Sequence, residues 1–334
     1  MTLLSVLDQS PVIAGHTAAD AIAATIELAQ LADDLGYTRY WCAEHHGLLG
    51  VCNPCPEVML ARLGSVTKRI RIGSGGVMLP YYSPFKVAEQ FMMLEALFPN
   101  RVDLGVGRAP GGDMRTAQAV AAGDYNRGDH FAEQVRDLVG LMDGKLPADH
   151  VAQGVVLQPR IDTRPQLWVL GSSDFGGLLA AQLGLRFSFA HFINAHFGHL
   201  VADAYRQRFT AGHEAKPWLA AAVFVICADT EAEAADLEKA VDLRRVQMAY
   251  GLNAPIPNLE QGLAQEYGDR ERLVIDREKP RSIIGTPETV TERLVALQER
   301  FQADELIVLT VTGSYAARLR SYELLADAFQ LPRA

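Results

Sequence analysis

The stretch Leu3-Leu4-Ser5-Val6-Leu7-Asp8-Gln9-Ser10-Pro11 decides between two parallel α/β folds that the sequence allows. Its apolar half is a candidate β-strand. A helical pattern over 20–35 follows, and it ends at Gly36, a residue that favours helix C-caps. An open, doubly wound sheet would place a glycine-rich phosphate loop directly after such an early strand. Residues 8–11 contain no glycine, so we predict the alternative, a closed barrel.

The same strand–helix order continues along the chain. Further candidate strands lie at 39–43, 71–78, 101–107, 166–170, 186–190, 218–228 and 305–312. Helical patterns follow them at 56–67, 83–98, 174–183, 196–210, from 230 onward and at 315–329. Strict alternation indicates a parallel sheet with crossover helices, and eight closed strand–helix pairs form a (β/α)8 TIM barrel. We predict a single α/β domain over 1–334.

Two segments interrupt this order and are expected to be insertions after strand 4 and strand 7. Residues 108–164 contain a Gly/Pro turn, two helical patterns and a candidate hairpin. Residues 251–281 are polar and rich in Pro and Gly, which predicts an excursion or mobile loop. In this position such a loop could act as a lid that excludes water.

The composition argues against several function classes. The chain has 334 residues, 49% of them hydrophobic, and 31 Lys+Arg against 40 Asp+Glu give a formal charge of −9. This acidic balance without basic runs argues against binding to nucleic acid or anionic membranes. We expect no targeting or membrane-spanning segment, because no leader pattern or long apolar run is present. Four cysteines are too few for a disulfide scaffold, so a cytoplasmic protein is expected.

In a TIM barrel the active site lies at the C-terminal ends of the strands. Polar residues and glycines follow several predicted strands and would meet at that rim. They are Glu44, His45 and His46 after strand 2, Ser74, Gly75 and Gly76 in strand 3, Arg108 after strand 4, Gly171, Ser172 and Ser173 after strand 5, and His191 after strand 6.

Each of these groups has a functional and a structural interpretation. Adjacent glycines in a strand indicate either a ligand lying against bare backbone or a tight barrel corner. Arg108 and the helix start at Ser173 would form a phosphate clamp, or Arg108 would pair with Asp113 or Asp103 and the serine would only cap its helix.

His45 and His46 fit acid–base chemistry or a metal site. Cys42, Cys52 and Cys55 lie nearby, but a single CxxC pair falls short of a structural zinc site. We therefore expect no metal and buried, structural cysteines.

The common nucleotide motifs are absent. The run Gly105-Val106-Gly107-Arg108-Ala109-Pro110-Gly111 misses the third glycine of GxGxxG by one position, and no Walker A pattern occurs. A nicotinamide or ATP site of the usual kinds is not expected.

Several strings together resemble the bacterial luciferase-like flavin monooxygenases, in the single-polypeptide subgroup with GSGGVMLP and GRAPG strings. They are YWCAEHH at 40–46, IGSGGVMLP at 72–80, RVDLGVGRAPG at 101–111, VLGSS at 169–173 and IGTPE at 284–288. The resemblance implies a barrel that binds reduced FMN, supplied by a separate and transient flavin reductase. O2 would then give a flavin hydroperoxide that oxidises an apolar or carbonyl-bearing small molecule.

The resemblance also implies roles for single residues. His45 would be the active-site histidine near the reactive edge of the flavin. Glu44 would lie beside it and either contact the ring or orient the site. Residues 74–76 would hold a non-prolyl cis peptide against the flavin ring. Arg108 would bind the FMN phosphate with Ser173 and the adjacent backbone (Gly171, Ser172 and Gly176), Ala190 would pack near the ring and His191 would lie at the pocket rim.

Two other functions stay open. A deazaflavin coenzyme could serve hydride transfer in the same barrel, although its greater acidity would favour more basic residues than Arg108. A non-catalytic flavin-binding protein is the second alternative. Apolar residues on more than one face of the 84–98 helix predict a homodimer, or burial of that helix by the 108–164 insertion.

Overall fold

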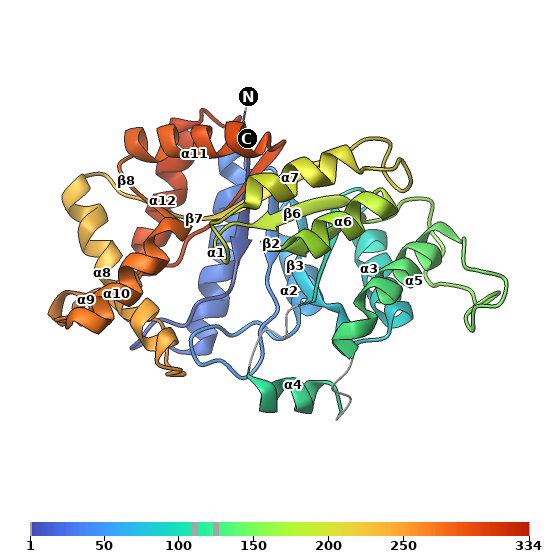
Figure 1. The fold of residues 1–334 in the computed structure, drawn as a ribbon, viewed down its shortest axis with the longest axis horizontal. Coiled ribbons are helices and arrows are strands. Elements are labelled where there is room, and N and C mark those ends of the chain that lie inside the picture. The colour runs from blue at the N-terminus through green and yellow to red at the C-terminus, as the bar shows by residue number, and fades with distance from the viewer. Residues whose placement is uncertain (1, 109–112, 123–126, 334) are drawn as a thin grey trace.

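The computed structural model describes residues 2–108, 113–122 and 127–333, and it confirms the TIM barrel (Figure 1). All pairings between neighbouring barrel strands are parallel, and the ring closes because β9 pairs with both β1 and β7. The strands of the ring are β1 (Leu3–Asp8), β2 (Arg39–Cys42), β3 (Arg71–Met78), β4 (Val102–Gly107), β5 (Gln166–Gly171), β6 (Arg186–Ala190), β7 (Leu219–Cys227) and β9 (Glu305–Leu309).

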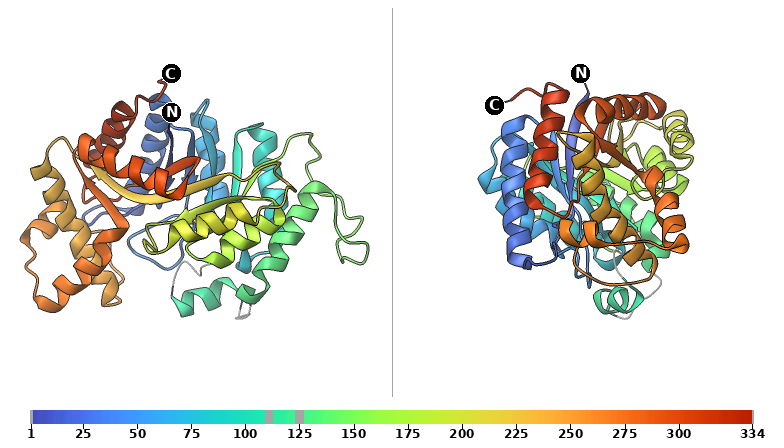
Figure 2. Two further views of the ribbon diagram at one scale, coloured as in Figure 1. Left: turned by 45° about the horizontal axis from the view of Figure 1, so that its top comes forward. Right: turned by 90° about the vertical axis from the view of Figure 1, so that its left-hand side faces the viewer.

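Helices surround the ring of strands (Figure 2). They are α1 (Ala18–Leu35), α2 (Pro56–Val66), α3 (Pro84–Leu97), α5 (Phe131–Asp143), α6 (Asp174–Leu183), α7 (Gly198–Gln207), α8 (Glu231–Ala249), α11 (Pro287–Phe301) and α12 (Tyr315–Ala328). The predicted end of α1 is confirmed, since Gly36 has a φ of 87° and its N–H donates to the carbonyls of Ala32 and Asp33. Within the described ranges, no helix combines the length and apolarity needed to cross a membrane.

The segment between β4 and β5 differs from the prediction. It contains the short helix α4 (Met114–Val120) and then α5, which packs against α3 as a crossover helix of the barrel. The predicted hairpin is wrong, because residues 144–165 form no strand. Pro147, Pro159 and Pro165 lie in this segment, and proline cannot donate the hydrogen bonds of a β-ladder.

The segment after β7 holds elements that the sequence did not predict. Residues 251–281 contain α9 (Leu259–Ala264), α10 (Asp269–Glu278) and the 3-10 turn η3 (Lys279–Arg281), and both helices pack against α8. β8 (Ser282–Gly285) then pairs with the C-terminal half of β7 and lies outside the closed ring, so the described residues form nine strands rather than eight. Only two adjacent residues of β8, Ile283 and Ile284, are apolar, so the segment shows neither alternation nor an apolar run long enough to predict a strand.

A buried ionic cluster occupies one end of the barrel interior. The guanidinium of Arg39 lies 2.6 Å from carboxylate oxygens of both Asp103 and Glu305, and Arg71 pairs with Asp103 at 2.7 Å. These residues begin their strands or lie next to the first position, so the cluster fills the N-terminal end. Any ligand site inside the ring must therefore open at the C-terminal end, as expected for this fold.

Candidate active site

Gly75 and Gly76 lie where β3 departs from regular pairing. The peptide between them is cis, as the resemblance implies, and the register of β3 against β4 shifts between Gly75 and Val77. A Cβ on Gly75 would lie 2.7 Å from Leu7 Cδ1, and one on Gly76 would lie 2.7 Å from the carbonyl oxygen of Gly105. Close packing inside the barrel therefore requires both glycines.

Gly107 marks open space in the barrel interior. Asp103 joins the interior ionic cluster, and Gly105 is close to the interior side chain of Leu170, so alternation along β4 directs Gly107 inward as well. A Cβ on Gly107 would meet no atom of the described residues within 4 Å. The C-terminal end of β4 thus faces an unfilled region beside the Gly75–Gly76 peptide.

Glu44 anchors the end of β2 to the segment that follows β3. Its buried carboxylate accepts hydrogen bonds from the Met78 N–H at 2.9 Å and the Tyr82 hydroxyl at 2.6 Å, and it lies 2.7 Å from Nε2 of His46. Both carboxylate oxygens are therefore occupied by the protein itself. This arrangement favours the orienting role among those considered for Glu44.

His45 is a neutral imidazole with an unused nitrogen. The backbone N–H of His45 donates to the carbonyl of Asn53 at 3.0 Å, which fixes the backbone of the loop after β2. The ring Nδ1 is buried and has no hydrogen-bond partner among the described residues. Burial, assisted by the nearby His46, lowers the pKa of His45 to about 4. A buried polar atom without a partner is uncommon and points to a ligand or water.

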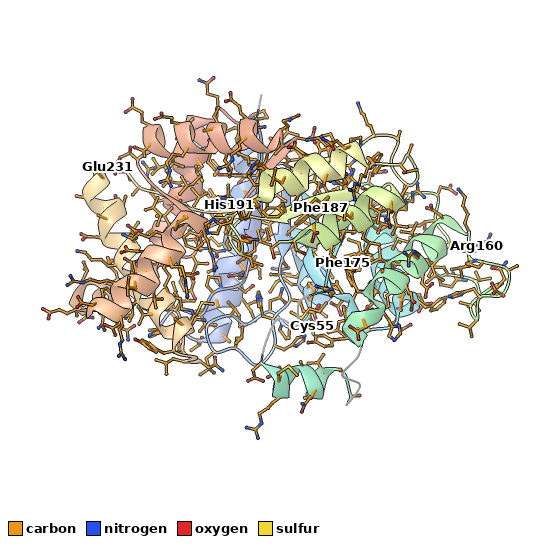
Figure 3. The ribbon with its side chains drawn as sticks, in the orientation of Figure 1. Cys55, Arg160, Phe175, Phe187, His191 and Glu231 are labelled. Atoms are coloured by element: carbon orange, nitrogen blue, oxygen red, sulfur yellow. The ribbon has the colours of Figure 1, made fainter. Side chains whose placement is uncertain are left out.

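Arg108 lies over the start of α6 rather than in a salt bridge. Its guanidinium is 4.6 Å from the ring centre of Phe175, the second residue of α6. Phe175 is labelled in Figure 3. The predicted ion pairs are not formed, because Asp103 binds Arg39 and Asp113 caps α4 through the N–H of Thr116. Within the described residues no carboxylate pairs with this exposed guanidinium, which leaves it available for an anion. Residues 109–111, the rest of the GRAPG string, lie outside the described residues.

The start of α6 has the features of an anion site. Ser173 is its N-cap, yet its side chain makes no capping hydrogen bond, so the hydroxyl is available. A Cβ on Gly171 would lie 3.7 Å from the Cα of Gly176, which shows how closely the helix start approaches β5. The Ser172 carbonyl accepts a hydrogen bond from Asn194. Arg108 and the first turn of α6 are therefore brought together.

His191 is separated from the other predicted residues. Arg186 stacks over the interior Trp168 ring, so alternation along β6 directs Ala190 into the barrel. His191 instead lies 6.0 Å, ring to ring, from Phe301 of α11, and it lines a cavity of about 360 Å³ on the helix side. Ala190 thus faces the interior, whereas His191 does not belong to this site.

The cysteines show no shared arrangement. All four thiols are free, and Cys42 and Cys227 are buried as expected, but Cys55 is exposed, which the sequence did not predict. Burial raises the pKa of Cys52 to about 11, so its thiolate is disfavoured. Across the part of the chain that the structure describes, no group of three or more His, Cys, Asp or Glu side chains could hold a metal ion.

Comparison with known proteins identifies the family. The family model described as luciferase-like monooxygenase matches residues 2–303. The chain belongs to the luciferase-like monooxygenase family. This luciferase-like monooxygenase is 37% identical over 332 residues to the N-acetyl-S-alkylcysteine monooxygenase of Bacillus subtilis, covering 98% of each chain. It superposes on apo-MsnO8 with a TM-score of 0.92 at 36% identity, covering 100% of both chains.

More distant structures share the fold of this luciferase-like monooxygenase. One is the oxygenating constituent of 3,6-diketocamphane monooxygenase from Pseudomonas putida in complex with FMN, at 20% identity, a TM-score of 0.69 and full coverage of both chains. Another is an F420-dependent secondary alcohol dehydrogenase, at 16% identity, a TM-score of 0.70 and 98% coverage of both. The fold alone is therefore compatible with either coenzyme.

Sequence reasoning missed three residues of this luciferase-like monooxygenase. Tyr82 contacts Glu44, Phe175 supports Arg108, and Gly107 leaves the open space. Gly107 had a usable signal, because Gly105 and Gly107 alternate on one face of a predicted strand. Tyr82 and Phe175 had none, since each lies far along the chain from its partner.

Proposed function

We propose that this luciferase-like monooxygenase uses reduced FMN, delivered by a separate flavin reductase, and O2 to oxidise an apolar or carbonyl-bearing small molecule. The observation that carries the proposal is the unpaired Arg108 guanidinium at the first turn of α6, next to the open space at Gly107. A planar ring with a phosphate tail fits a site with an open, glycine-lined strand end and an anion clamp.

The residues present fit this cofactor. Gly75, Gly76 and Gly107 would face the flavin ring, while Arg108, the Ser173 hydroxyl and free N–H groups of α6 would hold the phosphate. When bound, reduced FMN supplies the two electrons with which O2 is activated. The buried, unpartnered Nδ1 of His45 provides a hydrogen-bonding group at the same rim.

His45 would act as a neutral hydrogen-bonding group. With a pKa of about 4 the ring carries no charge at neutral pH, so it can donate one hydrogen bond and accept another without placing a cation in an apolar site. Glu44 would hold the ends of β2 and β3 in register, so that His45 and the Gly75–Gly76 peptide keep their relative positions.

The interior above the ionic cluster supports an apolar substrate. A cluster of apolar side chains packs in this region. It includes Leu7, Ala43, Leu170, Leu309 and Val311. The relative named N-acetyl-S-alkylcysteine monooxygenase adds S-alkylated cysteine derivatives as a class to screen.

The proposal is tested by anaerobic titration with reduced FMN, followed by rapid mixing with oxygenated buffer and analysis of oxidised product. We expect binding and oxygen-dependent product formation, and we expect His45→Ala to reduce turnover while flavin binding persists. Unchanged turnover in His45→Ala would remove the role of His45. Failure to bind reduced FMN, together with binding of the deazaflavin coenzyme, would favour hydride transfer. Binding without reaction in a broad substrate screen would favour the non-catalytic alternative.

We also propose that the chain forms a homodimer through α2 and α3. A groove between these helices is bordered by apolar side chains that are largely exposed, namely Val58 at 68%, Met93 at 53% and Leu97 at 57%. A second copy would cover this patch. Sedimentation equilibrium should give about twice the 36.5 kDa chain mass, and Leu97→Glu should give the monomer.

A further inference from the structure

The loop that carries His45 is held at its base by hydrogen bonds between its own residues. The backbone N–H of His45 donates to the Asn53 carbonyl at 3.0 Å, and the side-chain NH2 group of Asn53 donates to the Ala43 carbonyl at 3.2 Å. Asn53 is buried. These two bonds fix the points at which the loop leaves and rejoins the barrel. Neither bond involves the tip of the loop, residues 47–49.

The tip is held from the other side of the barrel mouth by Asn253. Its side-chain oxygen accepts from the Leu49 N–H at 2.8 Å, and its NH2 group donates to the Gly47 carbonyl at 2.8 Å. Both polar groups of one amide therefore bind one turn, 204 to 206 residues away in the sequence. Gly47 has a φ of 67°, so the turn adopts a conformation that favours glycine.

Asn253 is itself held in place by residues 250–257, which we name the strap. Ile256 exchanges backbone hydrogen bonds with the loop after β1, donating to Val12 and accepting from Ala14, each at 2.8 Å. Arg244 of α8 donates to the Ala254 carbonyl at 3.1 Å. The strap thus has a fixed position, and a short amide side chain can transmit that position to the tip.

The segment between β4 and β5 also approaches the turn at Gly47. A Cβ on Gly47 would overlap the side chain of Thr116 in α4, a helix that buries none of its residues. In Figure 1 the loop after β2 lies between the lower end of α8 and α4. The tip therefore contacts both the segment that follows β4 and the segment that follows β7.

We infer that Asn253 is a positioning residue for the oxygenation site, which fixes the His45 loop by clamping its tip to the strap; this inference rests on the proposed function for its catalytic consequence. Loss of the clamp would free the tip, and we expect this motion to reach the base, where the backbone N–H of His45 is bonded to Asn53. The neutral imidazole would then lose its fixed place at the rim, and reduced FMN would react with O2 to give FMN and H2O2 instead of FMN, oxidised substrate and water.

The test compares Asn253→Ala with Asn253→Asp, which keeps the acceptor for Leu49 but loses the donor to Gly47. Gln265→Ala is the control, because Gln265 lies in the same excursion and its side chain bonds only to the adjacent Glu266 carbonyl among the described residues. Amide hydrogen exchange is measured first on the protein alone. We expect exchange at Leu49 to rise about fivefold in Asn253→Ala, and exchange at His45, which the variant does not touch directly, to rise as well.

The second measurement is the yield of product and of H2O2 per reduced FMN. We expect Asn253→Ala to lower the product yield and raise H2O2 while the KM for substrate changes little, with Asn253→Asp intermediate and Gln265→Ala unchanged. A rise in exchange confined to Leu49 would overturn the inference, as would an unchanged product yield in an active oxygenase. Faster exchange at His45 in a protein that does not react with reduced FMN would support the clamp and overturn only the proposed function.

Discussion

The backbone N–H of Met78 donates to the buried carboxylate of Glu44 at 2.9 Å, and this bond ties the end of β3 to the loop after β2. The two residues flank the parts of the rim to which the site is assigned. His45 follows Glu44 directly, and the cis Gly75–Gly76 peptide lies just before Met78. This hydrogen bond, together with the pairing of Cys42 with Ser74, therefore fixes the end of β2 relative to the glycine peptide.

Removal of the Glu44 carboxylate should damage the fold and the site together. In Glu44→Ala the Met78 N–H would be buried without an acceptor, which costs about 1–3 kcal/mol. Urea denaturation should show this loss of stability. Tyr82→Phe is the milder comparison, because Glu44 keeps its bonds to Met78 and His46, and it should lose no more than about 1.5 kcal/mol. Equal stability of Glu44→Ala and the wild type would contradict the anchoring role.

Arg108→Ala should weaken the binding of FMN but hardly affect riboflavin, which lacks the phosphate. A charge-assisted hydrogen bond contributes about 1.5–3 kcal/mol, so we expect roughly a 10- to 100-fold increase in the Kd for FMN. Phe175→Leu removes the ring under the guanidinium but keeps the charge, so its effect should be smaller. Isothermal titration with both ligands checks this, and parallel losses for FMN and riboflavin would argue against a phosphate clamp.

Gly107 and Gly105 lie on the same face of β4, and only Gly105 is tightly packed. Alanine at each position therefore tests a different property, flavin binding at 107 and stability at 105. The new methyl group at position 107 meets no atom within 4 Å in the part of the chain that the structure describes, so stability should be retained while flavin affinity falls. At position 105 it would overlap the Ser74 carbonyl, so Gly105→Ala should lose about 1–3 kcal/mol or fail to fold. Thermal unfolding and flavin titration of both variants provide the measurement. Normal flavin binding by Gly107→Ala would place the cofactor elsewhere.

The lowered pKa of His45 predicts that stability depends on pH. Unfolding restores a pKa near the ordinary value of 6.5, whereas the folded protein holds it at about 4. The unfolded chain therefore binds the proton first, and stability falls as the pH drops from 6.5 towards 4, by about 1.4 kcal/mol per pH unit for this group. His191, whose pKa burial also lowers to about 4, contributes in the same direction.

The measurement is urea denaturation of wild type and His45→Gln at several pH values between 7.5 and 4.5. The variant should show the smaller loss of stability on acidification, whatever its absolute stability. His130→Gln, at an exposed ring, is the matched control. Identical slopes for His45→Gln and the wild type would show that His45 does not titrate abnormally.

The sequence by itself determined the barrel and the rim on which the site lies. Alternating strand and helix patterns are local, since each depends on residues within one element and its caps, such as Gly36 after α1. Parallel strands then order their C-terminal ends on one face, so Glu44, His45, Gly75, Gly76 and Arg108 could be assigned to that rim before any coordinates. The short strand β8 was not predicted, because only two adjacent residues of the four are apolar and they show no alternation.

Only the tertiary structure decided which residues meet. Arg108 had two candidate partners in sequence, and its contact with Phe175 exists because β4 and β5 are neighbours in the ring. His191 and Ala190 are adjacent in the chain, yet they lie on opposite faces of the barrel wall. Asn253 reaches Gly47 across about 200 residues. Such contacts depend on packing between distant elements, and no local pattern of hydrophobicity or spacing encodes them.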